Sequence, residues 1–171
     1  MNTYLKAFIY LILFGLLHFG YESTGLQFLK PICGTNESVF QHLKMGFFAY
    51  FFASLIEYVA IRRRLKANNF WSSRSLATVL NPWTIFLVWY LAPAVWGKFS
   101  TVASELSWAL IVSYISGVFA SILEKDIERA KISLCFKLIV FVLFVISAFL
   151  FIWFTYRLPW IDLFVDPLKL E

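Results

Sequence analysis

The chain has 171 residues, of which 61% are apolar and 20% aromatic, while only 15% are charged. A water-soluble domain cannot cover its surface with so few charged side chains, so this composition excludes an ordinary soluble protein and indicates an integral membrane protein. The net charge of +5 comes mainly from basic residues between apolar stretches, a distribution typical of membrane topology signals, so we expect no nucleic-acid partner.

Five apolar stretches are long enough to cross a membrane as helices, which takes about 20 residues each. In chain order they cover residues 7–28, 36–61, 76–96, 102–123 and 132–156, and a tail of residues 157–171 follows. The predicted fold is therefore an all-α integral membrane bundle of about five transmembrane helices in a single domain. We expect a multi-pass protein of the cell membrane, with the lipid bilayer as its surroundings.

Basic residues predict the orientation of this bundle. Nine lysines and arginines, among them Lys6 and the block from Arg62 to Arg74, flank the spans on one side, and five flank them on the other. Cytoplasmic loops carry the excess of positive charge in membrane proteins. The N-terminus is therefore predicted to lie inside and the C-terminus outside.

With this topology, most ionisable side chains that border the spans fall at the outer mouth of the bundle. They form a predicted polar cluster of two histidines and five acids, namely His18, Glu22, Glu37, His42, Glu105, Asp162 and Asp166. Glu57 is the intramembrane acid on the inner side. Ionisable groups in a membrane are costly, so their convergence at one mouth indicates a shared role.

His18 and Glu22 are four residues apart and therefore lie on one face of the first helix. Imidazole and carboxylate groups are ligands for zinc and similar divalent ions. The predicted ligand set for such a metal is His18, Glu22, Glu37 and His42. The alternative is that His18 and Glu22 form only a local hydrogen bond.

The other acids have simpler structural interpretations. Thr35 or Asn36 is expected to cap the second helix, which would place Glu37 in its first turn, where the helix dipole favours an acid. Glu57 is expected to pair with an arginine of the 62–64 block. Glu124, in the turn between the last two spans, is expected to be solvated and to pair with nearby basic residues.

Several short motifs are spread over the chain: HFGYESTG at the end of the first span, TNESVFQHLK at the start of the second, and LFVDP in the tail. They resemble the HFxYExSG, NESxxxHLK and LFxDP motifs of a family of small prokaryotic multi-pass membrane proteins that is known only as a domain of unknown function. The resemblance implies a membrane bundle but no activity. Gln41 stands where the family pattern has an acid, and the tail lacks the family's glycine-rich ending.

Three functional hypotheses follow, and whether the protein is an enzyme stays open among them. The favoured one is a structural or partner-binding bundle in which the polar groups lock helix ends. The first alternative is a small transporter or proton-coupled carrier that uses Glu22, Glu57 and Glu105, and that would need a homo-oligomer to form a symmetric path. The second is a membrane-embedded hydrolase that uses a divalent metal such as zinc in the outer cluster.

Overall fold

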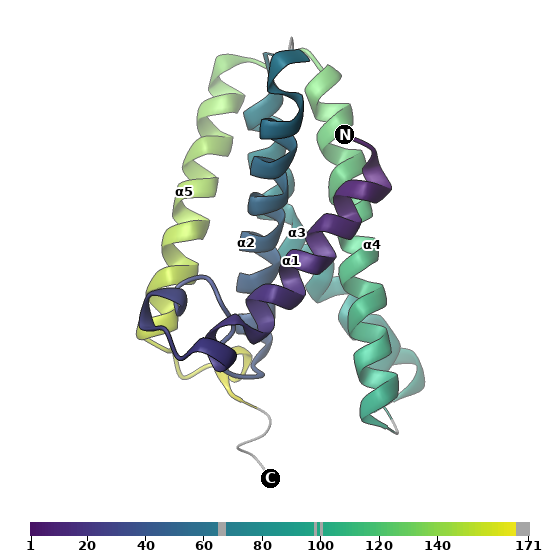
Figure 1. Cartoon of the computed structure of the whole chain (residues 1–171), viewed down its shortest axis with the longest axis vertical. Coiled ribbons are helices and arrows are strands. Elements are labelled where there is room, and N and C mark those ends of the chain that lie inside the picture. Colours follow the sequence, from purple (N-terminus) through teal and green to yellow (C-terminus); the bar gives the residue numbers. More distant parts are fainter. Residues whose placement is uncertain (65–67, 98, 100, 167–171) are drawn as a thin grey trace.

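The computed structural model describes residues 1–64, 68–97, 99 and 101–166, and its regular elements are helices (Figure 1). The five long helices are α1 (Thr3–Thr24), α2 (Val39–Ile61), α3 (Phe70–Trp96), α4 (Val102–Arg129) and α5 (Leu134–Tyr156). Three short 3-10 helices are η1 (Gln27–Leu29), η2 (Arg62–Arg64) and η3 (Asp162–Phe164). All five long helices are long and apolar enough to cross a membrane, which confirms the predicted all-α fold of a multi-pass membrane protein.

Local sequence signals set the first helix. The Asn2 side chain accepts hydrogen bonds from the backbone N–H groups of Tyr4 and Leu5, so α1 begins four residues earlier than predicted. It ends where Gly25 adopts φ 66° and donates its N–H to the Tyr21 carbonyl. The first span therefore stops short of the predicted Phe28.

Two other helices are longer than predicted, and both extend on the same side of the bundle. The α3 helix begins at Phe70, so the segment expected to lie in the headgroup layer is helical. The α4 helix continues to Arg129 through the expected turn. Charged residues at these positions predict chain outside the bundle, but three of them, Arg74, Glu124 and Glu128, are paired within it, as described below.

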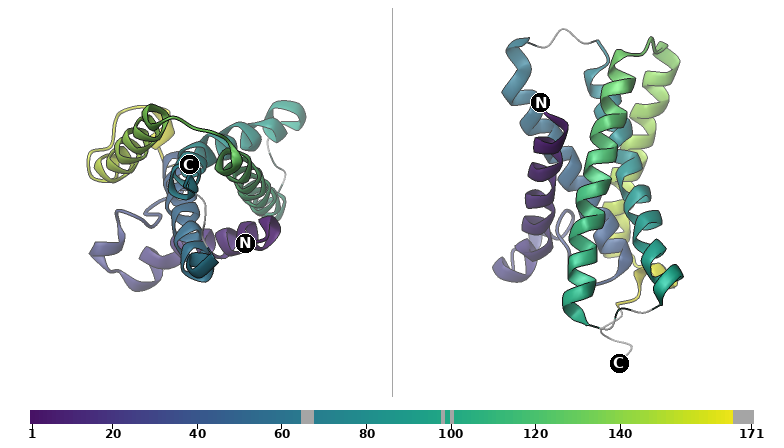
Figure 2. Two further views of the ribbon diagram at one scale, coloured as in Figure 1. Left: turned by 90° about the horizontal axis from the view of Figure 1, so that it is seen from above. Right: turned by 90° about the vertical axis from the view of Figure 1, so that its right-hand side faces the viewer.

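Four of the long helices form a ring. α1 contacts α2 and α4, and α3 contacts the same two helices. The view along the bundle shows this ring with α5 outside it, where α5 packs mainly on α3 (Figure 2). α5 is the most apolar of the five long helices, with a mean hydropathy of 2.8 over its 18 most apolar consecutive residues. Only 6% of these residues are buried. It therefore leaves most of its apolar surface uncovered by the other described helices.

Small residues let the ring close tightly. A Cβ atom on Gly46 of α2 would lie 2.5 Å from Ile85 of α3, and one on Gly117 of α4 would lie 2.5 Å from the ring of Tyr10. Both glycines lie on helix faces where small residues recur every three or four positions. Close backbone approach at such positions is typical of membrane helix packing.

The bundle has two chemically different ends. The histidine end holds the C-terminal end of α1 and the N-terminal end of α2, and lies at the bottom of Figure 1. The ion-pair end, at the top, holds the start of α1 and the junction of α4 with α5. Each end carries one cluster of ionisable side chains.

Candidate functional site

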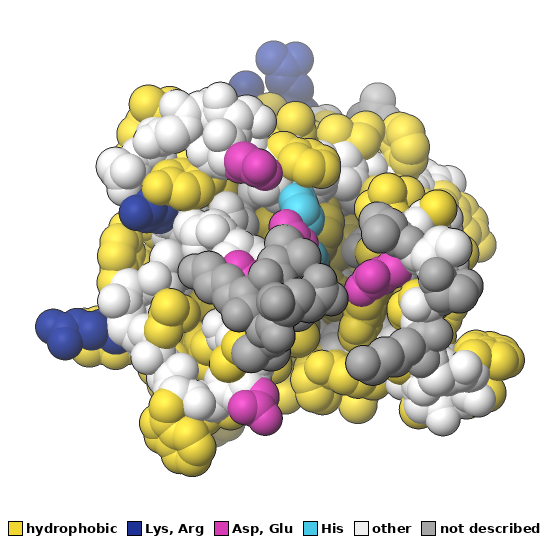
Figure 3. All heavy atoms as spheres, turned by 90° about the horizontal axis from the view of Figure 1, so that it is seen from below, with side chains coloured by type: hydrophobic (Ala, Val, Ile, Leu, Met, Phe, Trp, Pro, Cys, Tyr) yellow, Lys and Arg dark blue, Asp and Glu magenta, His cyan; other side chains and the backbone are white. Residues whose placement is uncertain are grey.

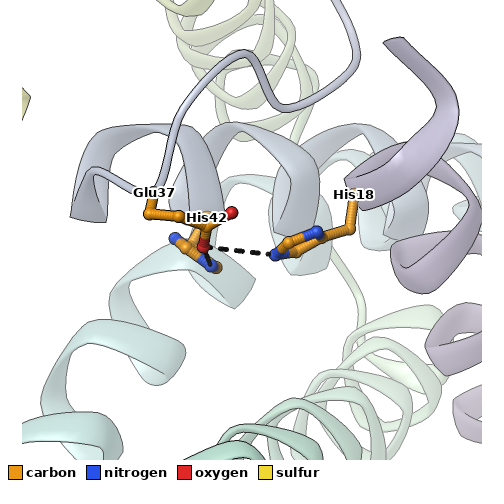
Figure 4. Close-up of side chains that lie close together, drawn as sticks. All are labelled: His18, Glu37 and His42. Carbon is orange, nitrogen blue, oxygen red and sulfur yellow. Dashed lines mark ion pairs between the residues drawn. The ribbon is translucent and has the colours of Figure 1, made fainter. Parts of the chain in front are cut away.

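Two histidines and one glutamate converge at the histidine end. His18 comes from α1 and His42 from α2, and Glu37 precedes α2 (Figure 4). The Oε2 atom of Glu37 lies 3.5 Å from the Nε2 atom of His18 and 3.5 Å from the Nε2 atom of His42. One ligand atom from each residue can be chosen so that all three lie within 4.8 Å of one another.

The orientation of the His42 ring is fixed by the backbone. Its Nδ1 atom lies 3.0 Å from the carbonyl oxygen of Ser38. A carbonyl oxygen only accepts hydrogen bonds, so Nδ1 carries a proton, and in the neutral ring Nε2 then presents a lone pair. That lone pair faces the Glu37 carboxylate, which also only accepts. A cation or an additional proton is therefore needed between them.

Two of the three spacings suit a small divalent metal. Zinc bonds to nitrogen and oxygen of about 2.0–2.1 Å at tetrahedral angles place neighbouring ligand atoms about 3.3–3.4 Å apart. Both Glu37–histidine distances, at 3.5 Å, are close to this value. Histidine ligands of metals commonly donate their second ring nitrogen to a carbonyl, as His42 does toward Ser38.

The three side chains are shielded but reachable. The relative exposures of His18, Glu37 and His42 are 23%, 42% and 30%. The space-filling view of this end shows histidine recessed, with acidic side chains around it and hydrophobic side chains beside it (Figure 3). A site of this kind is open to a small ion or to the polar part of a larger molecule.

Glu37 reaches the histidines because α2 begins later than predicted. The Asn36 side chain accepts a hydrogen bond from the Ser38 backbone N–H, and Ser38 itself is the N-cap residue of α2, without a side-chain capping bond. The expectation that Thr35 or Asn36 caps α2, with Glu37 in its first turn, is therefore wrong. The interaction with the His18 ring lowers the pKa of the Glu37 carboxyl, against the opposing effect of burial.

The remaining members of the predicted cluster lie further out. Glu22 is exposed in the last turn of α1 and does not belong to the three-residue group, although its charge acts on His18. Glu105 is exposed in the first turn of α4, and its charge acts on His42. Asp162 is exposed at the start of η3, and Asp166, which follows it, is half-buried.

The ion-pair end holds a second cluster that joins all four helices of the ring. Lys6 of α1 contacts Glu57 of α2 at 2.7 Å and Glu124 of α4 at 2.6 Å. Arg74 of α3 contacts Glu57 at 3.2 Å. Lys6, Glu57, Arg74 and Glu124 are at most 3% exposed.

Further partners complete this cluster and balance its charges. Arg74 also pairs with Glu128, the Met1 ammonium group lies 3.1 Å from Glu57, and the Tyr50 hydroxyl donates to Glu124 at 2.9 Å. The cluster contains three cationic groups and three carboxylates. Each carboxylate therefore faces at least one positive charge.

Two sequence predictions are corrected by this cluster. Glu57 pairs with Lys6 and Arg74, whereas Arg62 and Arg63 are exposed and the Arg64 side chain lies outside the described residues. Glu124 is fully buried, not solvated. The basic residues Lys6 and Arg74, which in the sequence indicate only topology, point into the ring. An apolar stretch follows each of them directly, which is the one local signal that they can turn inward.

Comparison with known proteins gives a family but no activity. Residues 2–170 match the family model described as a family of unknown function, DUF6512. No curated protein and no solved structure is detectably similar to the chain. Inferences about function therefore depend on the two clusters themselves.

Proposed function

The chain belongs to DUF6512, a family of unknown function, and we propose that it binds a divalent metal ion of the zinc class through His18, Glu37 and His42. The observation that carries the proposal is the position of one Glu37 oxygen, 3.5 Å from a ring nitrogen of each histidine. At least one of these nitrogens, Nε2 of His42, is held as a lone-pair donor by its backbone contact. A cation between the three groups satisfies all of them at once.

The chemistry of the donor set supports zinc or a similar ion. Two imidazole nitrogens and one carboxylate oxygen are the ligands of many catalytic zinc sites, and hard ions such as magnesium prefer oxygen alone. Three protein ligands leave a coordination position for water or substrate. The partial exposure of Glu37 supports such an open position.

We further propose that the protein lies in the cell membrane with the histidine end outside. The excess of lysine and arginine at the ion-pair end supports this orientation. The metal site would then sit at the outer surface of the bilayer, where it meets molecules from outside the cell or from the outer leaflet.

The activity that best suits this site is hydrolysis of an amphiphilic substrate, such as a lipid, at the outer face. A bound metal of this class lowers the pKa of water and polarises the bond to be broken. Glu105, the acid from α4 whose charge reaches His42, is the group we assign to take the proton of the attacking water and to return it to the leaving group. The hydrophobic side chains beside the recessed histidine suit an apolar part of the substrate (Figure 3).

Two features argue against a cation transporter. The ion-pair cluster joins all four helices of the ring, and Lys6 and Arg74 stand in it as buried positive charges. A metal ion moving through the ring would have to break these buried ion pairs, which is costly. Glu57, which a carrier would need as a free acid, is already paired with both cations.

The hypothesis of a structural bundle is supported by the ion-pair end, where buried ion pairs connect four helices. We assign the locking role to that end and the binding role to the histidine end. A partner-binding role has a candidate surface on α5, which is apolar and largely unburied, but lipid suits the same surface.

The test is metal analysis of protein purified in detergent, followed by zinc titration calorimetry. We expect one equivalent of metal in the unmodified protein and none in His18→Ala or His42→Ala. Glu22→Gln is the matched control, because it changes an acid on the same helix outside the three-residue group. Failure to bind zinc at micromolar concentration would overturn the proposal.

A second measurement addresses hydrolysis. Zinc-loaded protein in nanodiscs is offered amphiphilic esters and phosphodiesters, with zinc-loaded Glu105→Gln and metal-free His42→Ala in parallel. Turnover that requires both the metal and Glu105 supports the hydrolase, whereas tight zinc binding without turnover of any of these substrates would leave a metal site and reject the hydrolytic activity.

A further inference from the structure

A group of buried polar side chains lies between the two ends of the bundle and belongs to neither cluster. Tyr10 of α1, Asn81 of α3 and Ser116 of α4 are each 0% exposed. The Tyr10 hydroxyl interacts with the Asn81 amide, but neither that hydroxyl, nor the Asn81 Oδ1 atom, nor the Ser116 hydroxyl has a partner within hydrogen-bonding distance among the described residues. Leaving such groups unpaired in a protein interior is costly.

Tyr10 and Asn81 meet at one place in the ring. A Cβ atom on Gly46 would lie 3.6 Å from the Tyr10 hydroxyl and 3.6 Å from the Asn81 amide nitrogen. That amide nitrogen donates to the Gly46 carbonyl at 3.1 Å, which fixes the side chain and leaves Oδ1 as the unpaired acceptor. Ser116 precedes Gly117, the residue in tight contact with the Tyr10 ring.

Other hydroxyl groups in the helices show what Ser116 lacks. Ser54, Thr78 and Thr155 each donate to the backbone carbonyl four residues earlier, at 2.8–2.9 Å. This bond is the usual way for a hydroxyl in a membrane helix to be satisfied. The Ser116 hydroxyl makes no such bond, so it is free to bind a ligand inside the ring.

We propose that Tyr10, Asn81 and Ser116 form an internal water-binding site at the centre of the membrane-spanning ring. Water suits these groups because it is small, neutral, and both donates and accepts. No charged side chain takes part, so an ion has no countercharge there. The site also adjoins the ion-pair cluster, because the Tyr10 ring packs edge-on against Tyr50 at 5.7 Å and the Tyr50 hydroxyl donates to Glu124.

Radiolytic hydroxyl-radical labelling with mass spectrometry tests the site directly, because bound water generates radicals beside side chains that bulk solvent does not reach. We expect Tyr10 to be modified several-fold faster than Phe47, after correction for the rates of both residues in the unfolded chain. Phe47 is the matched control: it is equally buried, but it packs among the rings of Phe48, Phe144 and Phe151. Equal, negligible labelling of both residues would overturn the proposal.

A stability measurement gives an independent answer. Ser116→Ala removes a hydroxyl without adding volume, and we expect it to lower Tm by removing a partner of the bound water. In a dry interior the same change removes an unpaired polar group and raises Tm, which would count against the site. Ser54→Ala, which removes a hydroxyl already bonded to the Tyr50 carbonyl, provides the reference for a satisfied group. Neither measurement depends on the metal site.

Discussion

The ion-pair end and the histidine end both bring acids and nitrogen bases together, but only one of them matches every charge. At the ion-pair end, three carboxylates face three cationic groups, and the central side chains are almost fully buried. At the histidine end, one carboxylate faces two imidazole nitrogens, and all three side chains remain partly exposed. A matched cluster holds helices together, whereas an unmatched and reachable one suits the ligand proposed for it.

The largest effect is expected from breaking the matched cluster. Lys6→Met removes the cation that lies between Glu57 and Glu124 and leaves two buried carboxylates with fewer partners. We expect a loss of about 3–5 kcal/mol in the free energy of unfolding, measured by denaturation in mild detergent. Arg63→Met is the control, because Arg63 is exposed near the same end. Equal stability of the two variants would contradict the locking role.

The second-largest effect is expected at the histidine end, on the affinity for zinc. Glu37→Gln keeps the shape of the side chain but removes the charge that faces both histidines. Loss of even an outer-shell metal contact costs 10–100-fold in affinity, so we expect zinc affinity to fall by at least about 100-fold. Thermal stability without metal should change little, since Glu37 is 42% exposed. Undiminished zinc binding by this variant would remove Glu37 from the site.

Removing both partners of the Lys6–Glu57 ion pair tests whether the ion-pair end is stabilised by the pairing itself. In the double variant Lys6→Met, Glu57→Gln the cluster loses one charge of each sign, so less unbalanced charge stays buried than in either single variant. We expect a coupling energy of about 1–3 kcal/mol from a double-mutant cycle, in the sense that the double variant loses less than the sum. Additive losses would show that Lys6 and Glu57 act independently.

The smallest effect is a pH dependence at the histidine end. The folded-state pKa of Glu37 is lowered, chiefly by the His18 ring. Its contribution to stability is therefore present above the pKa of an unfolded glutamate and is lost as pH falls through the lower folded-state value. Because the group is partly exposed, we expect less than about 1 kcal/mol. The difference in unfolding free energy between the unmodified protein and Glu37→Gln, measured from pH 6 down to pH 3, should shrink toward zero.

Local sequence patterns predicted the helices of this protein and the end of the bundle at which its histidines lie. The five helices follow from five apolar stretches, and His18 and His42 were expected at a common end because consecutive membrane helices run in opposite directions. The exact membership of the three-residue group was not predictable. It depends on Asn36 and Ser38, whose backbone arrangement places Glu37 outside the helix, while Glu22 stays in α1 and remains exposed.

The sequence by itself determined the class of protein, the number of helices and the end at which the histidines lie, because hydropathy and helix length act locally along the chain. Tertiary structure decided how the charges are matched. Lys6, Glu57, Arg74 and Glu124 come from four different helices, and their pairing depends on helix rotation and depth, which no local pattern contains. The same packing left Glu37 between two histidines.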